Sequence, residues 1–174
     1  MILHYDIQDI VPYINWLYFY HAWSMNGKSE TAKLQLRKDA EEMLRTWEGC
    51  YHTHAVFGLF DANSDGDDLI LGDKRLPMLR QQKPKKPGYP NLCLADFVRP
   101  VGKGKDKVGV FATSVDAELQ KAYLHDDYQR MLSQVLADRL AEGTAEKMHE
   151  EVRRNYWGYA PNERLTMEQT HNEQ

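Results

Sequence analysis

Residues 119–152, LQKAYLHDDYQRMLSQVLADRLAEGTAEKMHEEV, decide the fold class, because their apolar side chains recur every three or four positions. This period predicts a long C-terminal helix. We expect the helix to break near the acidic pair Asp126–Asp127 or to soften at Gly143. The apolar stripe consists of Leu119, Tyr123, Tyr128, Met131, Leu132, Val135, Leu136, Leu140, Ala145, Met148 and Val152.

The N-terminal third also carries helical patterns. Residues 28–48 place apolar side chains at three- and four-residue steps, and Gly49 follows as a plausible stop. Residues 12–24, PYINWLYFYHAWS, are aromatic on nearly every face, which predicts a buried helix that starts at Pro12.

In the middle of the chain, the pattern of apolar residues changes from a helical period to one typical of strands. Strands are predicted for 54–60, 68–71, 92–98 and 107–113, with a turn at 61–67 and an exposed proline-rich loop at 83–90. Short connections favour antiparallel pairing. The prediction is an α+β fold, in which a small central antiparallel sheet carries N-terminal helices and a long C-terminal helix packed on it. We expect a single domain over 1–174, with a polar tail at about 166–174.

Composition narrows the function classes. The chain has 174 residues, 42% hydrophobic and 28% charged, with a net charge of −4. This acidic balance argues against nucleic acid as the main partner. No apolar run is long enough to span a membrane, and the start MILHYDIQDI has no signal-peptide pattern. The two cysteines, Cys50 and Cys93, fit a reducing compartment, so we expect a cytoplasmic protein.

Two motifs could hold a metal. DANSDG (61–66) matches the opening of a calcium loop, but position twelve of that loop is Gly72, which has no ligand. An ordinary hairpin turn explains the same residues. Cys50, His52 and His54 alternate as ligands on a strand would, without an evident fourth ligand, so a polar strand edge is the simpler interpretation.

Two charged features are open to a functional and an ordinary interpretation. The basic stretch from Arg80 to Lys86 predicts a solvated loop, with an acidic protein partner as the alternative. Asp138 and Glu142 lie four residues apart, so both project from one face of the long helix. Such pairs are usually solvated or pair with a neighbouring cation such as Arg139.

Several stretches in one order resemble the activation domain of cobalamin-dependent methionine synthase. The similarity runs from about Ile10 to about Leu165. The stretches are PYINW (12–16), HAW (21–23), GLFDAN (58–63), GDD (66–68), LRQQ (79–82), CLADFV (93–98), HDDY (125–128), LADRLAE (136–142) and YWGYAPNE (156–163).

The resemblance implies a role in reductive reactivation. The family's enzyme carries a methyl group on cobalt, and its activation domain caps the cobalamin when the cobalt has been oxidised. The domain then binds S-adenosylmethionine while a flavodoxin-type donor supplies an electron. The cofactor provides the chemistry, and the protein provides position and electrostatics.

The resemblance assigns cofactor-binding roles to three residues. Asp138 and Glu142 match an acidic pair that looks toward the cobalamin, where two carboxylates hold a water and offset the positive charge of the cobalt. Asn15 stands where the family often has an acid that meets the amino group of S-adenosylmethionine, so the charged part of that contact is lost.

The family also clamps S-adenosylmethionine with a later Arg-x-x-x-Gly-Tyr segment, and Gln174 comes before that segment would begin. Gly88-Tyr89 is no substitute, because Pro84 stands where the arginine would be. We therefore expect weak or absent binding of S-adenosylmethionine to the chain alone.

These features predict a component that acts in trans and is not catalytic alone. It would cap the cobalamin held by a partner, a methionine synthase that lacks a complete activation domain. The alternatives are an interaction or chaperone module for a corrinoid protein that does not bind S-adenosylmethionine, and an inactive remnant. No catalytic or metal-ligating residue is assigned.

Overall fold

The computed structural model describes residues 1–165 and 169, and its chain forms two compact units. Unit 1 consists of Met1–Val56 and Ala112–Gln174, and unit 2 of Phe57–Phe111. Most of the predicted polar tail, 166–174, lies outside the described residues. The two units are described separately below.

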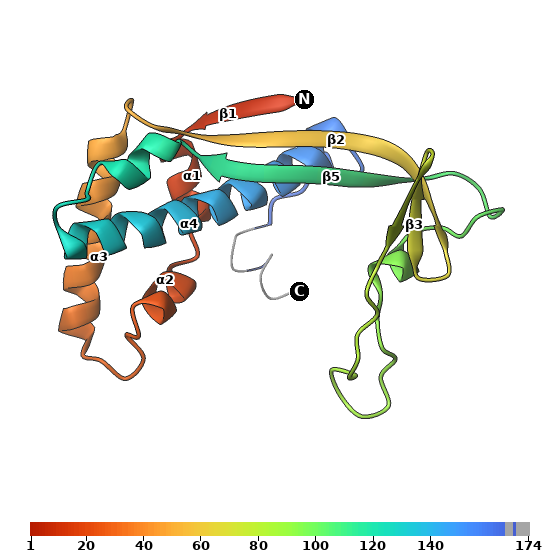
Figure 1. The fold of residues 1–174 in the computed structure, drawn as a ribbon, viewed down its shortest axis with the longest axis horizontal. Coiled ribbons are helices and arrows are strands. Elements are labelled where there is room, and N and C mark those ends of the chain that lie inside the picture. The colour runs from red at the N-terminus through yellow and green to blue at the C-terminus, as the bar shows by residue number, and fades with distance from the viewer. Residues whose placement is uncertain (166–168, 170–174) are drawn as a thin grey trace. The chain divides into compact units, whose positions relative to one another are not determined.

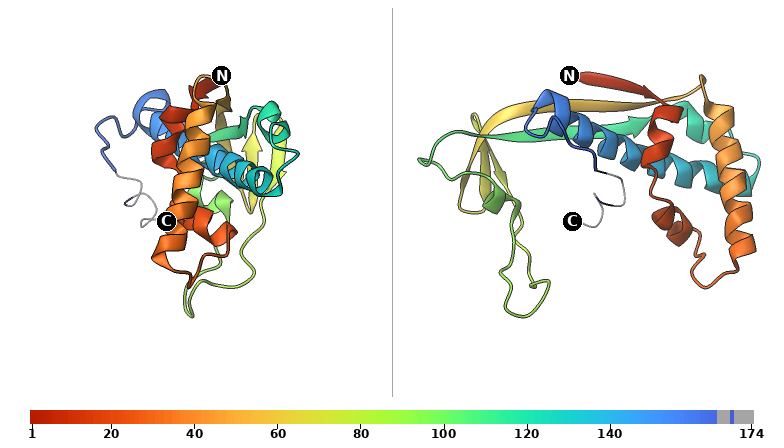
Figure 2. Two further views of the ribbon diagram at one scale, coloured as in Figure 1. Left: turned by 90° about the vertical axis from the view of Figure 1, so that its left-hand side faces the viewer. Right: turned by 180° about the vertical axis from the view of Figure 1, so that it is seen from behind.

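Unit 1 contains the four α-helices of the part of the chain that the structure describes and the ends of two long strands described below (Figure 1). In chain order its elements are β1 (Ile2–Asp6), α1 (Ile7–Ile10), the 3-10 helix η1 (Val11–Tyr13), α2 (Trp16–Ala22), α3 (Glu30–Trp47), the 3-10 helix η3 (Ala117–Lys121), α4 (Asp127–Glu151) and the π-helical turn η4 (Val152–Tyr156). Figures 1 and 2 show α3 lying across the beginning of α4, and the two helices are in contact.

The predicted C-terminal helix is confirmed, with its break where the acidic pair stands. Asp126 is the N-cap of α4, and its carboxylate accepts a hydrogen bond of 2.9 Å from the backbone N–H of Gln129. The helix does not soften at Gly143, which is buried against Ile10 and Tyr13. A glycine here lets another segment approach α4 closely.

The core of unit 1 is built from the apolar faces of α3 and α4 with side chains of the N-terminal segment. Its fully buried side chains include Ile7, Ile10, Phe19, Ala40, Trp47, Leu132, Leu136, Leu140 and Met148. The prediction that 12–24 is a helix buried on every face was wrong. The chain there forms η1 and then the short α2, in which Phe19 is buried while Leu17 and Tyr18 are exposed.

Five strands form one antiparallel sheet, which confirms the α+β class (Figure 1). The strands are β1, β2 (His52–Asp65), β3 (Asp68–Leu71), β4 (Lys74–Pro77) and β5 (Asp106–Val115). Their order is β1-β2-β3-β4, and β5 also pairs with β2. Residues 61–65, predicted as turn, belong to β2, and only the two residues at 66–67 make the turn.

One predicted strand is absent from unit 2. Residues 92–98 contain the 3-10 helix η2 (Leu94–Phe97) instead. Asp96 accepts a hydrogen bond of 2.8 Å from the backbone N–H of Cys93, and this cap favours the helical turn. Cys93 is buried, and Leu69 and Ala95 belong to the same small core.

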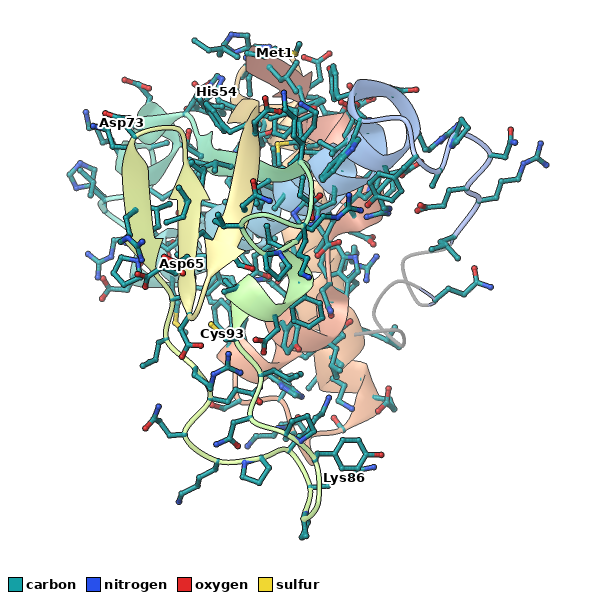
Figure 3. The ribbon with its side chains drawn as sticks, turned by 90° about the vertical axis from the view of Figure 1, so that its right-hand side faces the viewer. Met1, His54, Asp65, Asp73, Lys86 and Cys93 are labelled. Atoms are coloured by element: carbon teal, nitrogen blue, oxygen red, sulfur yellow. The ribbon has the colours of Figure 1, made fainter. Side chains whose placement is uncertain are left out.

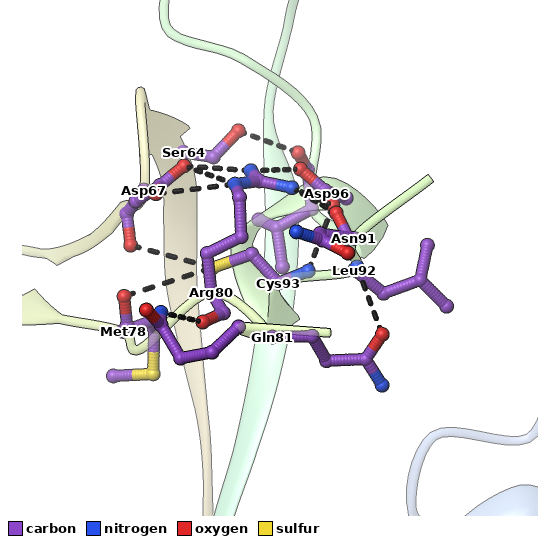
Figure 4. Close-up of polar contacts among 11 residues, drawn as sticks. Ser64, Asp67, Met78, Arg80, Gln81, Asn91, Leu92, Cys93 and Asp96 are labelled. Carbon is purple, nitrogen blue, oxygen red and sulfur yellow. Dashed lines mark hydrogen bonds and ion pairs between the residues drawn. The ribbon is translucent and has the colours of Figure 1, made fainter. Parts of the chain in front are cut away.

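The loop between β4 and η2 is exposed, as predicted for 83–90, and a guanidinium closes its base. Figure 3 shows Lys86 at the tip of this loop and Cys93 near its base. Arg80 donates to Asp67 at 2.6 Å, to Asp96 at 2.7 Å and to the Asn91 carbonyl at 2.7 Å (Figure 4). The basic stretch therefore begins with a structural residue and continues as a solvated loop.

Candidate functional site

The acidic pair predicted from the sequence lies on the outward face of α4. Asp138 and Glu142 are both exposed, whereas Leu136 and Leu140 on the opposite face are buried. Four residues make about one turn of an α-helix, so the two carboxylates stand one above the other. The predicted exposure is confirmed.

The two carboxylates differ in their surroundings. Glu142 accepts a hydrogen bond of 2.6 Å from the Arg139 guanidinium, which is the ordinary pairing anticipated for this helix. Asp138 has no hydrogen bond or ion pair with its side chain in the part of the chain that the structure describes. One carboxylate is therefore held by a cation, and the other is available to an external group.

A cavity of about 450 Å³ opens along the next turns of α4. Glu146, one turn beyond Glu142, lines it together with Lys147, Glu150 and Tyr13. The acidic face of α4 thus continues from the exposed pair into a concave surface within unit 1.

One tyrosine–glutamate pair, Tyr13 with Glu150, belongs to the wall of this cavity, and a second pair joins Tyr5 to the adjacent Glu151. The Tyr13 hydroxyl donates to Glu150 and the Tyr5 hydroxyl donates to Glu151, both at 2.7 Å. Burial, followed by these hydrogen bonds, raises the pKa of both phenols, and the bond from Tyr13 lowers the pKa of Glu150. The Lys147 ammonium lies 5.5 Å from the centre of each tyrosine ring. At neutral pH the wall therefore presents carboxylates, the Lys147 ammonium, the Arg153 guanidinium and the neutral phenol of Tyr13.

An ion pair links the segment YWGYAPNE (156–163) to η4, the turn that follows α4. Arg153 donates to both oxygens of Glu163, at 2.6 to 2.9 Å, and both side chains are largely shielded from solvent. Such bidentate pairs fix orientation as well as distance. Trp157 and Tyr159 stack edge to face at 5.4 Å within this segment.

Asn15 caps α2. Its side-chain oxygen accepts from the backbone N–H groups of Leu17 at 3.1 Å and Tyr18 at 3.4 Å. Since α2 packs against α4, Asn15 and the acidic pair belong to neighbouring elements of unit 1. A capping role is a sufficient structural reason for an Asn at this position.

The metal motifs do not assemble into a ligand cluster. Cys50 lies in the turn before β2, while His52 and His54 are on the strand and both approach Asp116. Among the residues that the structure describes, no group of three or more His, Cys, Asp or Glu could hold a metal ion. In the same part of the chain, no helix is long and apolar enough to cross a membrane.

The sequence analysis did not find the two tyrosine–glutamate pairs. They join residues that are 137 and 146 positions apart, so no local spacing in the sequence indicates them. The one available signal was the pair of adjacent acids at 150–151 near the end of an otherwise amphipathic helix.

The chain is similar to known proteins over nearly its whole length. The family model described as the activation domain of vitamin B12 dependent methionine synthase matches residues 6–174. A crystal structure of the MetH reactivation domain bound to AdoHcy is 37% identical, with a TM-score of 0.87. The similarity covers 99% of this chain and 61% of that one, so the chain spans less than two thirds of the solved relative.

Proposed function

Because the chain belongs to the family of methionine synthase activation domains, we propose that it acts in trans in the reductive reactivation of a cobalamin-dependent methionine synthase. Residues 1–174 would work as one domain that caps the cobalamin of a partner chain. The observation that carries this proposal is the exposed acidic face of α4, where the Asp138 side chain has no hydrogen bond or ion pair with any residue that the structure describes.

The residues on this face suit the group they would meet. Cobalamin, when held by the partner, supplies the redox and methyl-transfer chemistry at its cobalt. Asp138 and Glu142 would supply negative charge and hydrogen-bond acceptors for a water above that cation. Arg139 would keep Glu142 in place through the contact at 2.6 Å. These residues would position the water and offset the positive charge of the cobalt, and none of them is a catalytic acid or nucleophile.

The proposal includes S-adenosylmethionine as a ligand that this chain would bind with reduced affinity. The AdoHcy bound to the relative supports a ligand of this class. In this chain, Asn15 would offer the ligand's ammonium a neutral amide in place of a carboxylate, and its oxygen already accepts two backbone hydrogen bonds. The electron donor we propose is a flavodoxin-type protein, on the basis of the family resemblance alone.

The test is a titration of the full chain into cobalt(II) methionine synthase lacking a complete activation domain, followed through the corrin absorption. Wild type should shift the spectrum, and the double variant Asp138→Asn with Glu142→Gln should weaken the shift. Because both acids are exposed, the double change should alter the free energy of unfolding by no more than about 0.5 kcal/mol per site.

A matched control removes the same charge elsewhere in unit 1. Glu48→Gln with Glu118→Gln changes two exposed acids outside α4 and should leave the spectral shift as in wild type. If the α4 variant folds and still shifts the spectrum like wild type, the acidic pair does not face the cobalamin. If wild type itself gives no shift, the action in trans is refuted.

A further inference from the structure

A second cavity in unit 1 lies between α3 and the first turns of α4, and its volume is about 430 Å³. This volume is within the range of small-molecule sites. It combines acidic, aromatic and apolar side chains, and none of the described residues that line it is basic. The side chains that carry the argument are Asp39, Glu42, Met43, Tyr123, Tyr128 and Leu132.

Both aromatic walls are held in place before any ligand arrives. The buried Trp47 donates from Nε1 to the Tyr123 hydroxyl at 2.8 Å. The Tyr128 hydroxyl donates to Asp39 at 2.6 Å, and the ring of Trp23 packs 5.5 Å from that of Tyr128. A ligand that uses these ring faces therefore does not have to order them first.

The carboxylate of Asp39 offers negative charge, and both of its oxygens already accept a hydrogen bond. One oxygen accepts from Tyr128 and the other accepts from Gln35 at 2.7 Å. A primary ammonium would bring three N–H groups that compete with these two donors for the lone pairs of Asp39. A quaternary ammonium brings no N–H group, and it is attracted by negative charge and by the faces of aromatic rings.

Two further features favour a cation. Burial, together with the hydrogen bond to Asp39, raises the pKa of Tyr128 to about 12, so the phenol stays neutral at neutral pH. Unit 1 holds nineteen acidic and twelve basic residues, a net charge of −7, so its surroundings also attract a positive ligand.

We propose that this cavity binds a small quaternary ammonium ion, with its charge beside Asp39 and Glu42, its alkyl groups against the rings of Tyr123 and Tyr128, and its apolar part on Met43 and Leu132. The site is separate from the acidic pair of α4 and does not depend on the proposed role in reactivation.

The experiment titrates the full chain with choline and with 3,3-dimethylbutan-1-ol, which has nearly the same shape without the charge. The observed signals are the ring protons of Tyr123 and Tyr128 in NMR spectra. Choline should cause saturable shifts at millimolar concentration, and the neutral isostere should bind at least about fivefold more weakly. Methylammonium should also bind more weakly than choline.

Variants separate the cavity from general charge effects. Glu42→Gln should lower the affinity for choline about two- to fivefold, because an exposed carboxylate is screened by solvent. Tyr128→Leu removes a ring face and should lower it more. Glu48→Gln makes the same charge change at an exposed position after α3 and should have no effect.

Three results would overturn the proposal. They are equal binding of choline and its neutral isostere, an equal effect of Glu42→Gln and Glu48→Gln, and the absence of saturable shifts from wild type. Glu42 is exposed and outside the core, so we expect the Glu42→Gln variant to fold. Its loss of affinity can therefore be measured on a folded protein.

Discussion

Gly143→Ala should destabilise the protein although alanine is the better helix former. A Cβ at position 143 would lie 2.9 Å from Cγ2 of Ile10 and 3.4 Å from its carbonyl oxygen. In a free helix this change would stabilise by about 1 kcal/mol. Overpacking a tight contact typically costs about 1–3 kcal/mol. We therefore expect a net loss of about 1 kcal/mol in the free energy of unfolding.

The assay is denaturant unfolding followed by circular dichroism, with an unchanged m-value as the condition for comparison. The difference in stability between Gln134→Gly and Gln134→Ala, at an exposed position of the same helix, gives the effect of Gly-to-Ala propensity alone. In an Ile10→Ala background the obstructing Cγ2 is absent, so Gly143→Ala should become neutral or stabilising. A stabilising Gly143→Ala in the wild-type background would refute the close approach of Ile10 to α4.

Three further changes test other contacts. Arg80→Met should raise the pKa of Asp96 from about 2 toward its ordinary value, measured by carboxyl NMR titration. Because the folded pKa is depressed, this contact stabilises the protein above about pH 4, and the stabilisation is lost as the pH falls toward 2. Asn15→Asp keeps the helix cap and adds a charge, so calorimetry should show tighter binding of S-adenosylmethionine without a lower melting temperature. Trp47→Phe removes the bond to Tyr123 and part of a buried ring, and should cost about 1–3 kcal/mol in denaturant unfolding.

The sequence prediction was correct where the local period of apolar residues determines which face of a helix is buried. The apolar steps in α3 and α4 are regular, so the presence of both helices and the exposure of Asp138 and Glu142 followed from the sequence. The apolar stripe was drawn from Leu119, however, whereas α4 begins at Asp127. The break near Asp126–Asp127 was predicted as well, and the structure shows that Asp126 caps the N-terminus of α4 there.

Tertiary contacts determine the structure of the segments that were wrongly predicted from the sequence. The apolar run 92–98 is too short for its period to separate strand from helix, and Asp96 settles it by capping Cys93. β1 was missed because its register depends on a strand some fifty residues away, with His4 opposite His54. Neither case has a local signal strong enough to overcome the ambiguity.

The net charge of the whole chain also hides a difference in net charge between the two units, and this difference matters for both proposals. The net charge of −4 combines −7 in unit 1 with +3 in unit 2, which has ten basic and seven acidic residues. Asp138, Glu142 and the cavity between α3 and α4 all belong to the acidic unit. The average over 174 residues argues against nucleic acid as the main partner, yet a surface responds mainly to charges within about 10 Å. The local excess of carboxylates, rather than the overall balance, is therefore the physical reason to expect cations at these two places.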